Sequence, residues 1–231
     1  MLPPPAWCGR VSRRLTTMTF EVAHKAPGRS GGRARAATGR KLTGQKPALK
    51  MKEVMAIRIR LQMAGKIREL ALFNLGIDSK LRGCDLVRLR VEDVAVAGTV
   101  KNRAASVQKK TGRPVQFEIT DQARAAVGDL IQKHGLSGSD FLFRSRLASS
   151  ERLSTRQYAR LVRGWVSSIG LNPATYGTHS LRRTKVAMIY RKTGNLRAVQ
   201  LLLGHTKLES TIRYLGVEVD DALALSEQVD L

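Results

Sequence analysis

The sequence has few acidic residues and no long hydrophobic run. Asp plus Glu number 18 against 41 Lys plus Arg in 231 residues, and the formal net charge is therefore +23. No apolar run approaches the roughly 20 residues of a membrane-spanning helix. A chain so basic favours nucleic acid or an anionic membrane surface as its partner, and the absence of a spanning run argues against insertion in a membrane.

Cysteine is also scarce. Cys8 and Cys84 are far apart, and neither belongs to a C-x-x-C motif or to a Cys/His cluster. The sequence therefore predicts neither a disulfide framework nor a zinc site, and it fits a reducing, cytoplasmic compartment. Hydrophobic residues make up 42% of the chain, which is enough for a real core.

The first 45 residues differ in composition from the rest. They contain scattered arginines, prolines and glycines without a sustained apolar period, and we predict a disordered basic tail. An Arg-rich, acid-poor start also resembles a transit peptide, but the prolines and glycines do not suit a long amphipathic helix. Beyond residue 50 there remain 30 basic and 17 acidic residues, and the predicted domain over 46–231 is thus itself cationic.

The hydrophobic pattern predicts an α+β fold that is mainly helical. Period-2 alternation predicts strands over 91–98, 104–110 and 114–119, arranged as a three-stranded antiparallel sheet. The tail from residue 217 to 231 holds five acids and no bases, with apolar positions compatible with a small amphipathic helix. Helical spacing of apolar residues predicts helices over 50–64, 66–77, 121–134, 154–169, 180–193, 196–203 and 207–215.

Residues 178–214 hold most of the candidate chemistry. His179 and Arg182 stand three residues apart near a predicted helix start, where both side chains can face one anion such as a phosphate. His205 directly follows the glycine that ends the helix over 196–203. Thr206 and Glu209 read as a capping box for the last helix.

Tyr214 lies off the apolar stripe of that last helix. The stripe is Leu208, Ile212 and Leu215, and Tyr214 is about 100° away from Leu215 on a helical wheel. A core tyrosine would more naturally lie on the stripe. Each candidate alone has an ordinary structural explanation, and it is their joint arrangement that favours a functional site.

These residues resemble the tyrosine recombinases, or phage-integrase family, which includes the Xer recombinases. His179-Ser-Leu-Arg182 matches the family's His-x-x-Arg element, and Leu203-Gly204-His205 with Tyr214 nine residues later matches its last two elements. Upstream, Leu81-Arg82-Gly83 resembles the segment of the first arginine. The segment over 108–119, QKKTGRPVQFEI, resembles the family's lysine-bearing hairpin. The whole resemblance covers about residues 46–231.

The resemblance implies a role for each candidate residue. Tyr214 is the expected nucleophile at a DNA phosphate, and Arg82 with Arg182 is expected to hold the non-bridging oxygens. His179 assists proton transfer at the tyrosine, and His205 adds a hydrogen bond to the phosphate. The family needs neither a metal nor another cofactor.

The hairpin lysine, which protonates the leaving 5′ oxygen, is either Lys109 or Lys110. Neighbouring strand residues point to opposite faces, so the two lysines are not interchangeable. Lys110, directly before Thr-Gly, fits the family pattern better.

The expected function is site-specific recombination of double-stranded DNA by a bacterial mobile-element enzyme of the cytoplasm or nucleoid. Its expected partners are further copies of the chain in a tetrameric synapse, to which an accessory protein can be added. Relatives usually carry a separate DNA-clamping domain, and residues 1–45 are too short to build one. A topoisomerase-like nicking and resealing enzyme would use the same residues. An alternative from a different class is a non-catalytic DNA-binding or architectural protein with a relict site.

Overall fold

The computed structural model describes residues 45–146 and 150–216, which all belong to one compact unit, Thr43–Leu231. The predicted N-terminal tail and the predicted helix after residue 217 lie outside the described residues. None of the helices described is long and apolar enough to cross a membrane. The helices are α1 Met51–Met63, α2 Ile67–Asp78, α3 Gly83–Leu86, α4 Val91–Val94, α5 Asp121–Lys133, α6 Thr155–Ser168, α7 Thr178–Thr193, α8 Leu196–Leu203 and α9 Leu208–Leu215.

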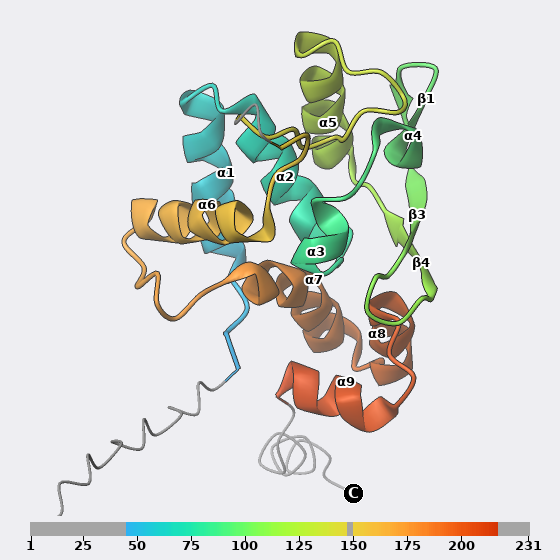
Figure 1. The fold of residues 1–231 in the computed structure, drawn as a ribbon. Coiled ribbons are helices and arrows are strands. Elements are labelled where there is room, and N and C mark those ends of the chain that lie inside the picture. The colour runs from blue at the N-terminus through green and yellow to red at the C-terminus, as the bar shows by residue number, and fades with distance from the viewer. Residues whose placement is uncertain (1–44, 147–149, 217–231) are drawn as a thin grey trace, which may run out of the picture. The chain divides into compact units, whose positions relative to one another are not determined.

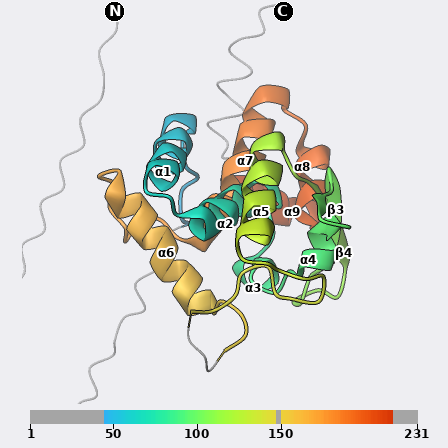
Figure 2. The ribbon, with the colours of Figure 1, turned by 90° about the horizontal axis from the view of Figure 1, so that it is seen from above.

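Helix α2 lies at the centre of the fold, between α1, α5 and α7 (Figure 2). Every residue from Ala71 to Asp78 is buried, as expected of a helix that is apolar on more than one face. Phe73 packs edge-on against Trp165 of α6, with ring centroids 5.5 Å apart. Helices α8 and α9 pack instead on a second, smaller apolar cluster with α7.

The prediction of a three-stranded sheet is wrong. The described strands form two antiparallel pairs, with β1 (Ala95–Val96) beside β2 (Thr99–Val100), and β3 (Arg103–Val107) beside β4 (Pro114–Glu118). The first half of the expected first strand is the helical turn α4, because the Asp93 carboxylate accepts a hydrogen bond from the Arg90 N–H at 2.7 Å and caps that turn.

A buried charge network connects three parts of the fold. Lys80, directly after α2, is 1% exposed and has a positive φ of 54°. Its ammonium lies 2.7 Å from Glu118 of β4, which also pairs with Lys185 of α7 at 2.7 Å. Lys185 pairs in turn with Asp78 at 2.8 Å. The network therefore fixes the end of α2, the β3–β4 hairpin and α7 relative to one another.

Glu118→Gln is expected to make the protein less stable at neutral pH. The two lysine hydrogen bonds outweigh partial burial and lower the pKa of Glu118 to about 2. Because the folded pKa lies below the ordinary value of 4.5, the stabilisation is fully present above pH 4.5 and is lost as the pH falls towards 2. We expect the substitution to lower the free energy of unfolding by about 2 kcal/mol at pH 7. This is less than the loss expected for a fully buried ion pair, since the Glu118 side chain is 37% exposed.

The measurement is urea unfolding of both proteins at several pH values. The difference between wild type and Glu118→Gln should shrink between pH 4.5 and pH 2. Glu151→Gln, which removes an exposed carboxylate outside the network, is the control. A difference in the free energy of unfolding that is independent of pH would contradict the lowered pKa of Glu118.

Candidate active site

Two arginines from distant segments are linked to one backbone carbonyl, Arg182 directly and Arg82 through the side chain of Gln108. Arg82, at the start of α3, donates a hydrogen bond to the side chain of Gln108, and Gln108 donates to the carbonyl oxygen of Leu203 at 3.2 Å. Arg182 of α7 donates to the same carbonyl oxygen at 2.9 Å. Arg182 is 3% exposed, and Gln108 is 1% exposed. The end of α8 therefore joins the two predicted phosphate-binding residues.

Tyr214 packs among the other candidates. Its ring lies edge-on to His205, with centroids 5.5 Å apart, and 5.9 Å from the guanidinium carbon of Arg182. Arg183 lies 5.4 Å from the same ring centroid. The Tyr214 hydroxyl and Arg182 Nε are buried and have no hydrogen-bond partner among the residues described. Buried polar atoms of this kind are uncommon outside functional sites, because leaving them unpaired is unfavourable.

His205 is positioned by the turn between α8 and α9. Gly204 ends α8 with a φ of +66°, a left-handed conformation that glycine adopts without strain. A Cβ atom there would lie 2.7 Å from Val115 Cγ2, and the turn can approach the hairpin only because residue 204 has no side chain. His205 Nδ1 lies 3.1 Å from the hydroxyl of Thr211, which is fully buried.

The start of α9 differs from the sequence prediction. The helix begins at Leu208, and the residue before it, Lys207, makes no side-chain cap. The expected capping box from Thr206 is therefore absent. Leu208, expected on the buried stripe, is 40% exposed, whereas Thr211 is buried. Thr211 thus lies on the inner face of α9, where it contacts His205.

His179 and Lys110 are less closely engaged. His179 is the second residue of α7 and is partly exposed. Removal of water from its inner side lowers the pKa of His179, and the positive charges of Arg182, Arg82 and Arg183 lower it further. Lys110 is exposed in the turn of the β3–β4 hairpin, which runs alongside α8 (Figure 1), and the described residues offer it no hydrogen bond or ion pair.

Burial dominates the acid–base properties of the site. It raises the pKa of Tyr214 to about 12, although Arg182, Arg183 and Arg82 act in the opposite direction. Burial also lowers the pKa of His205 to about 4, and here the charges of Arg182 and Arg82 add to the effect. At neutral pH the site therefore presents a neutral phenol and a neutral imidazole beside permanently charged guanidinium groups.

The low pKa of His205 gives a direct prediction. In the free protein its imidazole should titrate near pH 4 and stay neutral from pH 7 to pH 5.5. The measurement is the ¹H–¹³C NMR shift of the histidine Cε1 group as a function of pH, with the His205 signal identified by its loss in His205→Gln. His134, an exposed histidine after α5, is the internal reference. A midpoint above pH 6 for His205 would contradict the described surroundings.

Sequence reasoning missed several residues around the site. Gln108 was not singled out, although it connects Arg82 to α8. Asp85 has no role in the sequence prediction, yet its carboxylate accepts the Lys109 N–H at 2.9 Å, which ties α3 to the hairpin. A glutamine at the end of a strand carries no sequence signal. An acid three residues after a candidate arginine is the one signal that could have been used.

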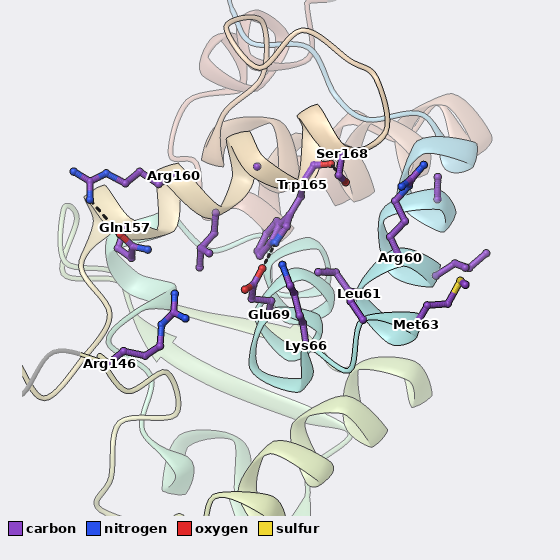
Figure 3. Close-up of a pocket in the computed structure, with 15 residues that line it drawn as sticks. Arg60, Leu61, Met63, Lys66, Glu69, Arg146, Gln157, Arg160, Trp165 and Ser168 are labelled. Atoms are coloured by element: carbon purple, nitrogen blue, oxygen red, sulfur yellow. Dashed lines mark hydrogen bonds between the residues drawn. The ribbon is translucent and has the colours of Figure 1, made fainter.

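The largest hollow described lies away from these residues, between α1 and α6. It has a volume of about 1130 Å³, and its wall includes Trp165, which donates a hydrogen bond to Glu69 at 2.7 Å (Figure 3). Arg60, Arg146 and Arg160 also line it. None of the predicted catalytic residues does, so the candidate active site is defined by side-chain contacts and not by the size of a cavity.

The geometry and the sequence together define a DNA-recombinase type of catalytic domain. Residues 48–220 match the Phage integrase family, and the chain belongs to this family. It is 27% identical over 157 residues to the probable integrase/recombinase YoeC of Bacillus subtilis, covering 68% of this chain and 82% of YoeC. It is 28% identical to the tyrosine recombinase XerC of Chromobacterium violaceum, covering 65% of this chain and 48% of XerC. The chain thus spans about half the length of that XerC relative.

Solved structures share the fold. XerA recombinase superposes with a TM-score of 0.65 at 19% identity, covering 80% of this chain and 65% of XerA. XerH site-specific recombinase bound to its difH substrate superposes with a TM-score of 0.61 at 18% identity, covering 79% of this chain and 54% of XerH. At these identities the likeness establishes the architecture of a tyrosine recombinase catalytic domain.

Proposed function

We propose that the protein is a site-specific DNA recombinase or integrase that cleaves and rejoins double-stranded DNA through a 3′-phosphotyrosyl intermediate. The observation that carries this proposal is the packing of Tyr214 against His205 and Arg182. Arg82 is connected to Arg182 through the Gln108 side chain and the Leu203 carbonyl group. A phenol, two guanidinium groups and a neutral imidazole are the groups that phosphoryl transfer to tyrosine requires.

The reaction consists of two transesterifications. The Tyr214 oxygen attacks the scissile phosphorus, a tyrosyl O–P bond forms, and the bond to the 5′ oxygen breaks. The free 5′ hydroxyl of another strand then attacks the phosphotyrosine and releases Tyr214. Each step exchanges one phosphate ester for another, so no external energy source is needed. Arg82 and Arg182 stabilise the charge that develops on the non-bridging oxygens.

Two proton transfers accompany cleavage. With a pKa of about 12, the Tyr214 phenol is neutral and must lose its proton during attack. His179, whose pKa is lowered, is neutral and can assist in taking that proton. Lys110 donates a proton to the departing 5′ oxygen. His205 donates a hydrogen bond to a phosphate oxygen.

The role of Lys110 can be tested by changing the leaving group. Lys110→Ala should slow cleavage of ordinary DNA by about 10²- to 10⁴-fold, since general acid catalysis is lost. A substrate with sulfur at the 5′ bridging position should restore much of that rate, because a thiolate, with a thiol pKa of about 8.5, leaves without a proton. The measurement is single-turnover cleavage of both substrates.

Lys109→Ala is the matched control for this experiment. Its ratio of rates on the two substrates should equal that of the wild type. If the sulfur substrate rescues Lys109→Ala and not Lys110→Ala, the two lysines must be reassigned.

The test of the whole proposal is trapping on nicked DNA. A suicide substrate releases a short fragment after cleavage, so rejoining fails and a covalent protein–DNA adduct accumulates. Peptide mapping should find the DNA on Tyr214. A substrate with two sites then separates recombination from topoisomerase-like nicking and resealing. Absence of an adduct from any family-related site, despite DNA binding, would favour a non-catalytic DNA-binding protein.

The proposal extends to assembly and location. Exchange between two duplexes requires four strand cleavages, and hence four tyrosines in a tetrameric synapse of residues 46–231 as catalytic domains. The acidic segment 217–231 is proposed to dock on a neighbouring basic copy, and an accessory protein can join the complex. Such an enzyme of a mobile element acts in the bacterial cytoplasm, at the nucleoid.

A further inference from the structure

We propose that Arg88, Lys109 and Arg152 form a second binding site, which holds a backbone phosphate of DNA beside the scissile one. This inference rests on the proposed function, because it assumes that DNA reaches the candidate active site. It adds a contact that neither the family motifs nor the comparisons assign. The three residues contribute to DNA affinity and to the placement of the strand, and they take no part in bond breaking.

The three cations converge on one hollow of about 330 Å³. Arg88 follows α3, Lys109 begins the turn of the β3–β4 hairpin, and Arg152 precedes α6. No Asp or Glu lines the hollow. The other lining residues are Cys84, Leu153 and three residues with hydroxyl groups, Ser150, Ser154 and Thr155.

The positive charges in the hollow are not compensated by carboxylates. Among the residues described, no ion pair involves Arg88, Lys109 or Arg152. Other basic side chains of the protein do have acidic partners, as Lys80 and Arg144 show. Three like charges around one concave surface repel one another, and an anion between them relieves that repulsion. Guanidinium, ammonium and hydroxyl groups are all donors that suit phosphate oxygens.

The position of the hollow identifies the anion as a DNA phosphate. Cys84 lines it two residues after Arg82, and the Lys109 N–H is held at 2.9 Å by Asp85 of the same helix α3. Gln108, directly before Lys109, contacts Arg82. The hollow therefore lies beside the candidate active site. Each strand of duplex DNA carries a phosphate about every 3.4 Å of helix axis, so a strand held by Arg82 brings further phosphates to this surface.

The two adjacent lysines of the hairpin have different roles in this proposal. Both lysines are exposed in the turn of the hairpin, but Lys109 lines the hollow and Lys110 does not. Lys109 therefore binds a phosphate that is not cleaved, and this leaves Lys110 for the leaving group. Neighbouring residues of one hairpin thus serve two different phosphates.

The experiment is the salt dependence of DNA binding by the full chain. Fluorescence anisotropy gives the binding constant of a labelled duplex at a series of salt concentrations for wild type, Arg88→Ala, Lys109→Ala and Arg152→Ala. Each substitution should reduce the slope of log K against log salt concentration by about 0.9, the value for one lost phosphate contact. Lys133→Ala, at the end of α5 and outside the hollow, is the matched control and should leave the slope unchanged.

Two further measurements make each result decisive. Circular dichroism establishes whether the variants are folded. Arg88→Lys keeps the positive charge, so this variant should retain the wild-type slope even if Arg88→Ala does not fold. Variants that are folded and show the wild-type slope would overturn the phosphate site while leaving the proposed recombinase intact. A wild-type chain that binds no DNA and forms no adduct would overturn both proposals.

Discussion

Replacement of Tyr214 by phenylalanine is expected to abolish the covalent protein–DNA adduct. Phenylalanine has no oxygen with which to form a phosphate ester, so the loss should reach the detection limit, at least about 10³-fold. The fold should survive, because the ring keeps its contacts with His205 and Arg182. The hydroxyl that is removed is buried without a hydrogen-bond partner, so its loss is not expected to destabilise the protein.

Tyr190→Phe is the matched control for this variant. Tyr190 and Tyr214 pack against the same small apolar cluster of Val186, Val199 and Leu203. Both variants lose one phenolic oxygen from the same part of the protein. Adduct formation by Tyr190→Phe should equal that of the wild type, with both measured by gel mobility after denaturation. An adduct that persists in Tyr214→Phe would assign the nucleophile to another residue.

Arg182→Lys is expected to have the second largest effect. Removal of a preorganised donor to a developing oxyanion lowers rates by about 10²- to 10³-fold. Arg182 uses Nη2 to hold the Leu203 carbonyl oxygen and retains further N–H donors for a phosphate. A lysine ammonium is a single point charge, and it cannot keep the bond to the carbonyl and present a fork to the phosphate at the same time. The measurement is single-turnover cleavage at saturating DNA.

The neighbouring residue offers the control. Arg183 also lies near the Tyr214 ring, but its Nη1 donates to the carbonyl oxygen of Lys46 at 2.7 Å. Arg183→Lys should change the cleavage rate by no more than a few-fold. Thermal unfolding of both variants separates a loss of stability from a loss of catalysis. Equal losses of activity in the two variants would show that positive charge near the ring, and not the contact of Arg182 with phosphate, determines the rate.

The longer helices of the fold could be predicted from the sequence, because their apolar spacing is a local property. The predicted helix over 196–203 matches α8, and that over 121–134 matches α5 to within one residue. The sheet could not be predicted in the same way. Alternation over residues 91–98 indicated a strand, but the capping bond from Arg90 to Asp93 makes the first half helical. A side chain that bonds to its own backbone overrides the alternation of apolar residues.

The candidate site shows the same difference between local patterns, which can be predicted from the sequence, and long-range contacts, which cannot. The four residues from His179 to Tyr214 lie in one stretch of sequence, and their spacing could be read directly. The sequence could not reveal the buried partners that join them, because those contacts bring together residues that are far apart. Gln108 meets Leu203 across 95 residues, and Lys80 meets Glu118 across 38. Neither pair has a periodic pattern that would identify it.

The tight fit of Gly204 against the hairpin also has a consequence during synthesis of the chain on the ribosome. Arg82, Gln108 and the hairpin are synthesised well before the turn at Gly204 that they face, and Tyr214 follows later still. A growing chain therefore holds Arg82 and Gln108 without the Leu203 carbonyl to which Gln108 donates, and without the phenol. On the proposed assignments, a ribosome-bound fragment that lacks the last helices cannot cut DNA.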